Sequence, residues 1–270
     1  MPYVESHGVR IPAMGLGTMT LKGDVCINTV TKALELGYRN IDTAQNYGNE
    51  REVGEGIRSS GVKREDVFLT TKIYWNRLPE FEKAVDESLA TLKFPWVDLL
   101  LIHWQAPDMK VADTVKTLCT FKRKGLAKNV GVANFTVAML DEAVKVADEP
   151  LIANQIEVHP FLDQTKVIAA CKKHDISVTA YCPIARGKIG GEVLDRIGKA
   201  HGKTAAQVSL RWLVQQNIVP IPRSSNPQHL ADNLNVFDFK LSDSEMADIG
   251  KLARPDGRVV NPAHHPQWDV

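Results

Sequence analysis

The chain has no excess of charge of either sign. Its 270 residues include 33 Lys and Arg against 32 Asp and Glu, which gives a net charge of +1 when histidine is neutral. Proteins that bind nucleic acid or anionic membranes usually carry a clear basic excess, which is missing here. We therefore expect a small molecule as the partner, with no nucleic acid and no membrane. Nothing in the sequence indicates an obligate interface, so we expect a monomer.

Long apolar runs and paired cysteines are also missing. No stretch approaches the roughly 18 apolar residues that a transmembrane helix needs, and the first residues, MPYVESHGVRIP, do not resemble a secretory signal. The four cysteines, Cys26, Cys119, Cys171 and Cys182, are scattered, with no C-x-x-C pair and no metal-ligand spacing. These absences predict a cytoplasmic protein in a reducing compartment, without a metal site.

What the chain does contain is a regular alternation of short apolar runs and longer segments with helical spacing. In residues 82–92, for example, Val85, Leu89 and Leu92 fall on one helical face. The short runs are hydrophobic throughout, which is typical of parallel strands buried on both faces. They cover residues 13–17, 38–44, 67–73, 97–103, 129–134, 151–157, 177–183 and 218–224.

Eight strand–helix units in about 250 residues match the size of a single (β/α)8 barrel. An open doubly wound sheet is the alternative, and it would be expected to carry a glycine fingerprint. Gly15-Leu16-Gly17 begins such a pattern, but Thr20 stands where the third glycine should be. We predict an α/β fold, a (β/α)8 TIM barrel, with residues 1–270 as one domain. A short N-terminal β-hairpin over 4–12, turning at 6–8, and a C-terminal tail after residue 253 complete it.

Two other suggestive motifs have simpler explanations. The run 198–204 resembles a phosphate-binding P-loop, but its first glycine is one residue too close to Gly202. Gly202 can instead end one helix in the left-handed conformation, and Thr204 with Gln207 can form a capping box on the next. His264 and His265 have no carboxylate or cysteine partner at helical spacing, which favours a solvated loop over a metal site.

Polar side chains gather where the predicted strands end, which is where a βα barrel places its chemistry. The strand ends and the loops after them carry Asp42, Tyr47, Glu50, Lys72, His103, Trp104, Asn134, Gln155, Glu157, Tyr181, Arg223 and Ser224. Taken singly, each has an ordinary structural explanation, such as a surface tyrosine or a hydrogen-bonded core histidine.

Four of these residues together suit one reaction. Lys72 ends an apolar strand, so its ammonium group should be partly desolvated and need a counter-ion, which Asp42 on the neighbouring strand can supply. An adjacent ammonium group would lower the pKa of Tyr47 below its usual value of about 10 and make it a better proton donor. His103 can hydrogen-bond a carbonyl oxygen without carrying a charge. The set suits protonation of a carbonyl oxygen while hydride reaches its carbon.

Several segments, in this order along the chain, strongly resemble signatures of the aldo-keto reductases. They are GYRNIDTAQNYGNE at 37–50, LIHW at 101–104, VGVANF at 130–135 and IPRS at 221–224. The resemblance covers almost the whole chain and is closest to the bacterial 2,5-diketo-D-gluconate reductases, whose members also reduce methylglyoxal. It implies Tyr47 as the general acid, Lys72 and Asp42 as the pair that adjusts it, and His103 as the residue that orients the substrate carbonyl.

The same resemblance implies NADPH as the cofactor, with NADH as the alternative. Asn134 and Gln155 would hold the nicotinamide carboxamide, and Tyr181 would stack on the ring. Arg223, just before a predicted helix N-terminus, would bind the 2′-phosphate. The other cofactor residues implied are Gly17, Thr18, Asp42, Cys182, Pro183, Ile184, Ile221, Ser224, Ser225, His229, Asp232 and Asn233. The substrate pocket would be lined by Met19, Tyr47, Tyr74, Trp75, His103 and Trp104.

The chain departs from the family pattern at a few positions. Ala133 and Cys182 stand where serine is usual, Tyr74 where many relatives have tryptophan, and His229 where many have an arginine near the 2′-phosphate. A neutral histidine weakens the preference for NADPH without reversing it, because Arg223 remains.

We therefore predict an NADPH-dependent reductase of aldehydes, ketones or dicarbonyls. A nucleotide-binding regulatory barrel without significant turnover is a second hypothesis, although such a module would not need Tyr47 and Lys72 together. A (β/α)8 hydrolase is a third, and it would need a metal cluster or paired carboxylates at the strand ends, which the sequence does not show. The short loop at 105–108 and the short tail indicate an open pocket and broad specificity.

Overall fold

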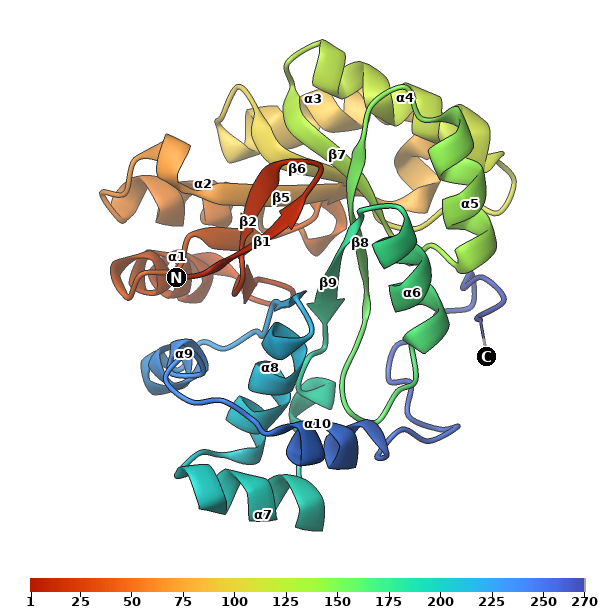
Figure 1. Ribbon diagram of the computed structural model, residues 1–270. Coiled ribbons are helices and arrows are strands. Elements are labelled where there is room, and N and C mark those ends of the chain that lie inside the picture. The colour runs from red at the N-terminus through yellow and green to blue at the C-terminus, as the bar shows by residue number, and fades with distance from the viewer. Residues whose placement is uncertain (270) are drawn as a thin grey trace.

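The computed structural model describes residues 1–269, which contain eight parallel strands in one curled sheet surrounded by helices (Figure 1). Each strand lies beside its neighbours in the sequence. The strands are β3 (Leu16–Gly17), β4 (Asn40–Asp42), β5 (Phe68–Ile73), β6 (Val97–Ile102), β7 (Ala127–Ala133), β8 (Leu151–Glu157), β9 (Ser177–Tyr181) and β10 (Ile218–Pro220). This architecture confirms the predicted (β/α)8 barrel.

The first and last strand segments close the barrel through backbone hydrogen bonds. The amide of Gly15 donates to the oxygen of Pro220 at 3.0 Å, and that of Gly17 donates to the oxygen of Pro222 at 3.2 Å. Glycine is needed for this approach, because a Cβ on Gly17 would lie 2.7 Å from the backbone oxygen of Ile221. The Gly-Leu-Gly run that begins like a dinucleotide fingerprint thus serves the closure of the barrel.

Ten α-helices lie within residues 1–269, and at least one follows each strand of the barrel. They are α1 (Gly23–Glu35), α2 (Glu50–Ser59), α3 (Phe81–Leu92), α4 (Val111–Arg123), α5 (Val137–Val146), α6 (Thr165–Lys173), α7 (Glu192–His201), α8 (Ala205–Gln215), α9 (Pro227–Leu234) and α10 (Asp243–Gly250). Two helices follow β9 and two follow β10, so α7 and α10 are additions to the simple repeat. None of the helices in the described residues is long and apolar enough to cross a membrane.

The N-terminal hairpin forms as predicted. Strands β1 (Tyr3–Ser6) and β2 (Val9–Pro12) pair antiparallel, and His7 and Gly8 turn the chain with φ of 47° and 78°. Its apolar face packs Val4 and Ile11 into a cluster with barrel residues such as Leu99. The hydroxyl of Ser6 donates to the oxygen of the residue-175 peptide just before β9, so the hairpin covers the amino-terminal end of the barrel.

Several strands are shorter than their apolar runs, and β4 and β10 are shortened most. The run 218–224 ends as a strand at Pro220, because Pro220 and Pro222 have no N–H with which to continue the ladder. The run 38–44 becomes strand only at Asn40–Asp42. Tyr38 is fully buried before it, and its hydroxyl donates to the oxygen of Leu230 at 3.0 Å. The remaining residues of these runs form the loops that carry polar side chains.

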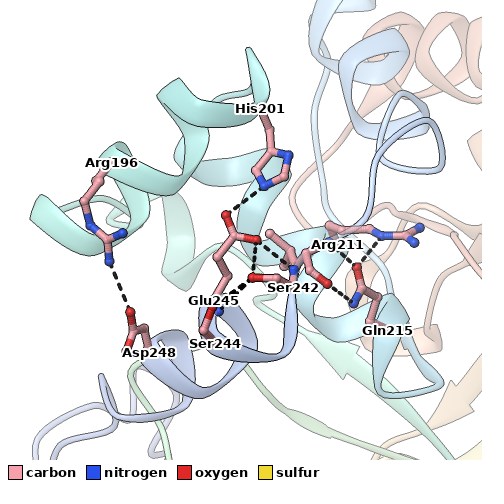
Figure 2. A network of polar contacts seen from close by, with 9 residues as sticks. Arg196, His201, Arg211, Gln215, Ser242, Ser244, Glu245 and Asp248 are labelled. Carbon is pink, nitrogen blue, oxygen red and sulfur yellow. Dashed lines mark hydrogen bonds and ion pairs between the residues drawn. The ribbon is translucent and has the colours of Figure 1, made fainter.

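The glycine-rich run at 198–204 is a helix junction, as predicted. Gly202 ends α7 with a φ of 64°, and Thr204 forms a capping box with Gln207 at the start of α8. Helix α10 is in turn tied to α7 by polar contacts, shown in Figure 2. His201 Nε2 lies 2.8 Å from Glu245 Oε1. The chain after α10 then passes the end of β8, where Glu157 accepts from two of its backbone amides.

Candidate active site

The ends of β4 and β5 bring three of the predicted catalytic side chains together. Lys72 Nζ lies 2.6 Å from Asp42 Oδ1, donates to the oxygen of Thr43 at 2.8 Å, and donates to Tyr47 Oη at 3.4 Å. The side chain of Lys72 is 0% exposed and that of Asp42 is 3% exposed. The structure therefore contains the expected buried ion pair between Lys72 and Asp42, next to the hydroxyl of Tyr47.

The loop after β4 holds Tyr47 in place through its backbone. Residues 45–47 form a single 3-10 turn, and the ammonium group of Lys22 donates to the backbone oxygens of Tyr47 and Gly48. Two residues later, the buried Asn49 accepts from Thr43 Oγ1 at 2.8 Å and donates to the oxygen of Thr18 at 2.8 Å. These bonds fix the backbone of the loop that places the phenol beside Lys72.

The electrostatics of Tyr47 differ from the sequence-based expectation. Its pKa is raised well above 10, first by burial and then by the charge of Asp42. The expected lowering by Lys72 is wrong, because the Asp42 carboxylate offsets the ammonium charge and desolvation then prevails. Burial likewise lowers the pKa of Lys72, against the effect of Asp42. Tyr47 consequently keeps its proton through neutral pH and is present as a donor.

His103 completes the group from the end of β6. Its ring lies 5.7 Å from the ring of Tyr47, edge to face. Burial, followed by the charge of Lys72, lowers the pKa of His103 well below 6.5, so the ring is neutral, as expected. Its buried Nδ1 has no hydrogen-bond partner within residues 1–269. A neutral imidazole with spare bonding capacity is suited to orienting an uncharged oxygen.

The residues predicted to hold the nicotinamide are joined to this group. Asn134 has a φ of 63°, and its backbone N–H donates to the backbone oxygen of Gln155 at 3.0 Å. Its Oδ1 accepts from the hydroxyl of Tyr181 at 2.8 Å. The side-chain amide of Gln155 donates to Asp42 Oδ2 at 2.7 Å. Three strands therefore present amide and aromatic groups at one edge of the catalytic pair.

The residues predicted for the rest of the cofactor lie around the closure between β3 and β10. Gly17 and Ile221 are in close contact there, and buried Thr18 donates its hydroxyl to the oxygen of Asp42 at 2.9 Å. Cys182, Pro183 and Ile184 form the loop after β9, where Cys182 has a φ of 49°.

The segment after β10 has the chemistry of an anion site. Arg223 is exposed and donates to Thr20 Oγ1 at 2.8 Å, while the buried Ser224 accepts from the amide of residue 226 at 3.1 Å. Helix α9 follows with proline in its first turn, as predicted. Ser225 and His229 are exposed, whereas Asp232 is half-buried. Asn233 is buried and hydrogen-bonds the Tyr38 hydroxyl, so its side chain is directed toward the barrel.

An aromatic wall faces the catalytic group. The ring of Tyr74 lies 5.5 Å from that of His103, with Trp75 6.1 Å beyond it. Trp104, at 5% exposure, directly follows His103. Met19 lies on the loop after β3 and is 49% exposed, so it stands at the rim of the barrel mouth.

The tail adds residues to this wall that the sequence analysis missed. His264 was expected in a solvated loop, but its Nε2 lies 3.1 Å from Tyr74 Oη and its ring lies 5.3 Å from both Trp75 and Trp104. Trp268 also reaches Trp104, with the ring centroids 6.1 Å apart. The C-terminal tail has no hydrophobic periodicity, so only its histidine and aromatic residues could have indicated that it contacts this wall.

A fully buried carboxylate anchors the tail. Glu157, the last residue of β8, accepts from the backbone amides of Val259 at 2.6 Å and Val260 at 2.9 Å, and lies 2.9 Å from His159 Nε2. Charge-assisted bonds of this kind are stronger than neutral ones. Glu157 therefore fixes the segment that brings His264 to the aromatic wall.

Comparison with known proteins agrees with this geometry. The sequence pattern of the Aldo/keto reductase family matches residues 13–254. The chain belongs to this family. It is 40% identical to methylglyoxal reductase DkgB of Escherichia coli O157:H7 over 267 residues, covering 97% of this chain and 100% of the relative.

Two further relatives of this aldo/keto reductase show the breadth of the family. Morphine 6-dehydrogenase of Pseudomonas putida is 39% identical over 279 residues, covering 95% of this chain and 94% of the relative. A crystal structure provisionally named as a 2,5-diketo-D-gluconic acid reductase B superimposes with a TM-score of 0.97 and 44% identity, covering 100% of this chain and 98% of the other. Aldo/keto reductases are oxidoreductases that act on carbonyl groups with nicotinamide cofactors. The names of the relatives differ in substrate, so membership alone does not fix one.

Proposed function

We propose that the protein catalyses the NADPH-dependent reduction of aldehydes, ketones or dicarbonyls, of the methylglyoxal or 2,5-diketo-D-gluconate type, to alcohols. The observation that carries the proposal is the buried Lys72–Asp42 pair, with Lys72 Nζ 2.6 Å from the carboxylate and 3.4 Å from the phenol of Tyr47. Neutral His103 lies beside that phenol. An acid, its adjusting pair and an orienting imidazole are the parts that carbonyl reduction needs.

In this proposal each side chain has one task. The substrate carbonyl is oriented by His103, and its oxygen takes the proton of Tyr47 Oη as negative charge develops there. The high pKa of the resting phenol keeps that proton in place until the oxygen becomes strongly basic. Lys72 then stabilises the phenolate, and Asp42 holds Lys72 in position.

The cofactor residues of the proposal fit the groups around them. NADPH, when bound, supplies the hydride. Asn134 and Gln155 would hold the carboxamide beside Tyr181, because their backbones are hydrogen-bonded to each other at the ends of β7 and β8 and Asn134 Oδ1 accepts from the Tyr181 hydroxyl. Arg223, exposed before the N-terminus of α9, would bind the 2′-phosphate, and exposed His229 lies on the same helix.

The test is NADPH oxidation by the purified protein with methylglyoxal and with 2,5-diketo-D-gluconate as acceptors. The Tyr47→Phe variant should lose about 10²–10⁴-fold in kcat while the Kd for NADPH stays within about twofold, because the hydroxyl acts in the transition state. The Arg223→Gln variant is the matched control and should raise the KM for NADPH but not for NADH. A wild-type protein that binds NADPH yet turns over neither acceptor would favour the regulatory barrel instead.

A further inference from the structure

The turn after β3 holds a threonine in a strained conformation. The backbone amide of Leu21 donates to the backbone oxygen of Thr18 at 3.0 Å, which closes a four-residue turn. Of its two central residues only Thr20, the third of the four, has a positive φ, at 72°. This is the pattern of a type II turn, whose third position favours glycine or asparagine. Glycine would form the same turn without strain, so a β-branched residue there needs another explanation.

A buried side chain keeps this turn in place. Asn49, which is 0% exposed, donates to the backbone oxygen of Thr18 at 2.8 Å and to that of Leu21 at 3.1 Å. Asn49 comes two residues after Tyr47, so the turn is bound to the loop that carries the proposed acid. A strained residue persists only where its surroundings fix it, and these two bonds fix both ends of the turn that contains Thr20.

The side chain of Thr20 contacts one cation of the proposed cofactor site. Its Oγ1 accepts from Nη2 of Arg223 at 2.8 Å. The two residues come from opposite sides of the barrel closure, where the amide of Gly17 donates to the oxygen of Pro222. Within residues 1–269 the guanidinium of Arg223 makes no ion pair, so its other donors are available to a phosphate.

This contact orders a side chain that would otherwise move freely. Arg223 is exposed, and fixing a long arginine in one rotamer costs conformational entropy. A group that is held in place before the ligand arrives does not lose that entropy on binding. The hydroxyl of Thr20 therefore prepares Arg223 for an anion, and the strain in the turn is explained by the position that it gives to this hydroxyl.

We propose that Thr20 is a positioning residue for the cofactor: its hydroxyl orients Arg223 for the 2′-phosphate and so raises the preference for NADPH over NADH. The inference rests on the proposed function, in which Arg223 binds that phosphate. Thr20 acts through Arg223 and has no part in the proton transfer from Tyr47. Its effect is therefore on the affinity for one cofactor.

The experiment measures binding without turnover. Calorimetry compares adenosine 2′,5′-bisphosphate with 5′-AMP, which lacks the 2′-phosphate. Thr20→Val keeps the branched shape but loses the acceptor, so it should lower the ratio of the two affinities by about three- to tenfold, as expected for one hydrogen bond. Thr20→Ser keeps the hydroxyl and should keep the ratio. Thr91→Val, at an exposed site on α3, is the matched control and should also leave it unchanged.

The strain has its own test. Thr20→Gly should lose as much of the affinity ratio as Thr20→Val, yet unfold at an equal or higher urea concentration, because glycine adopts a positive φ freely. The ratio of the Kd values for NADPH and NADH, measured by quenching of protein fluorescence, should change in step with the calorimetric ratio. A glycine variant that unfolds at a clearly lower urea concentration would contradict the assignment of strain to Thr20.

A double variant shows whether Thr20 acts through Arg223. Arg223→Gln/Thr20→Val should have the same affinity ratio as Arg223→Gln alone, and a further loss would mean that Thr20 does not act by positioning Arg223. Equal weakening of both nucleotides by Thr20→Val would mean that Thr20 merely supports the turn. An unchanged ratio in Arg223→Gln would refute the proposed phosphate site and the inference together. A ratio lowered by Arg223→Gln but not by Thr20→Val would refute the inference alone.

Discussion

Replacing Lys72 with methionine should destabilise the fold strongly and in a pH-dependent way. The substitution keeps much of the side-chain volume but leaves the carboxylate of Asp42 buried with Gln155 as its remaining side-chain donor. Removing one partner of a buried ion pair costs about 3–5 kcal/mol. At about 2–4 °C per kcal/mol for a domain of similar size, the Tm should fall by roughly 6–20 °C.

The pH dependence follows from the carboxyl group. Burial raises the pKa of Asp42, and the opposing charge of Lys72 is gone in the variant. The folded variant then binds a proton at Asp42 where the unfolded chain has lost it, so its stability falls as the pH rises above about 4. The stability gap between wild type and variant should therefore be smaller at pH 5 than at pH 7.5.

Urea unfolding at both pH values, followed by circular dichroism, measures the effect. The double variant Lys72→Met/Asp42→Asn removes both charges and should regain roughly half of the lost stability or more, while remaining inactive. Lys199→Met, at an exposed site on α7, controls for the loss of a lysine. A single variant less than about 1 kcal/mol weaker than wild type, or a double variant no more stable than the single one, would refute this account of the pair.

Three further predictions concern the frame of the site. Gly17→Ala places a Cβ 2.7 Å from a backbone oxygen and should cost about 1–3 kcal/mol in urea unfolding, whereas Gly190→Ala, with open space around it, should be nearly neutral. Glu157→Gln weakens the anchor of the tail, so limited proteolysis should cleave residues 258–269 faster, with the barrel intact. Hydrogen bonds from Ser242 and His201 outweigh burial and lower the pKa of Glu245. Its ionised form therefore stabilises the folded protein, and this contribution is lost as the pH falls. Glu245→Gln should make the free energy of unfolding depend less on pH on the acid side.

The barrel and the catalytic group could be predicted from the sequence because both depend on repeating backbone geometry. Continuous apolar runs at regular intervals indicate parallel strands, and the ends of such strands meet at one mouth. Asp42, Lys72 and His103 lie at or next to the carboxyl ends of three consecutive strands, so their proximity follows from the order of the strands in the barrel. The run 151–157 coincides with β8 for the same reason.

The tail residues and the pKa of Tyr47 could not be predicted in this way. His264 and Trp268 lie in a segment without periodicity, and their positions depend on one carboxylate, Glu157, more than a hundred residues earlier. The direction of the Tyr47 pKa shift depends on how much water reaches the phenol and on how far Asp42 offsets Lys72. Neither quantity is contained in local sequence.

The closure of the barrel by Gly15 and Gly17 also orders events during synthesis. These residues bond to Pro220 and Pro222, about 200 residues away, so the loop that must close is among the longest in the chain. Contacts so distant in sequence form late, after neighbouring strands have paired. A ribosome-bound chain can assemble β4 to β9 beforehand, but the two sides of the proposed cofactor cleft meet only when the last strand has emerged. Nucleotide binding by a nascent chain would therefore report closure of the barrel.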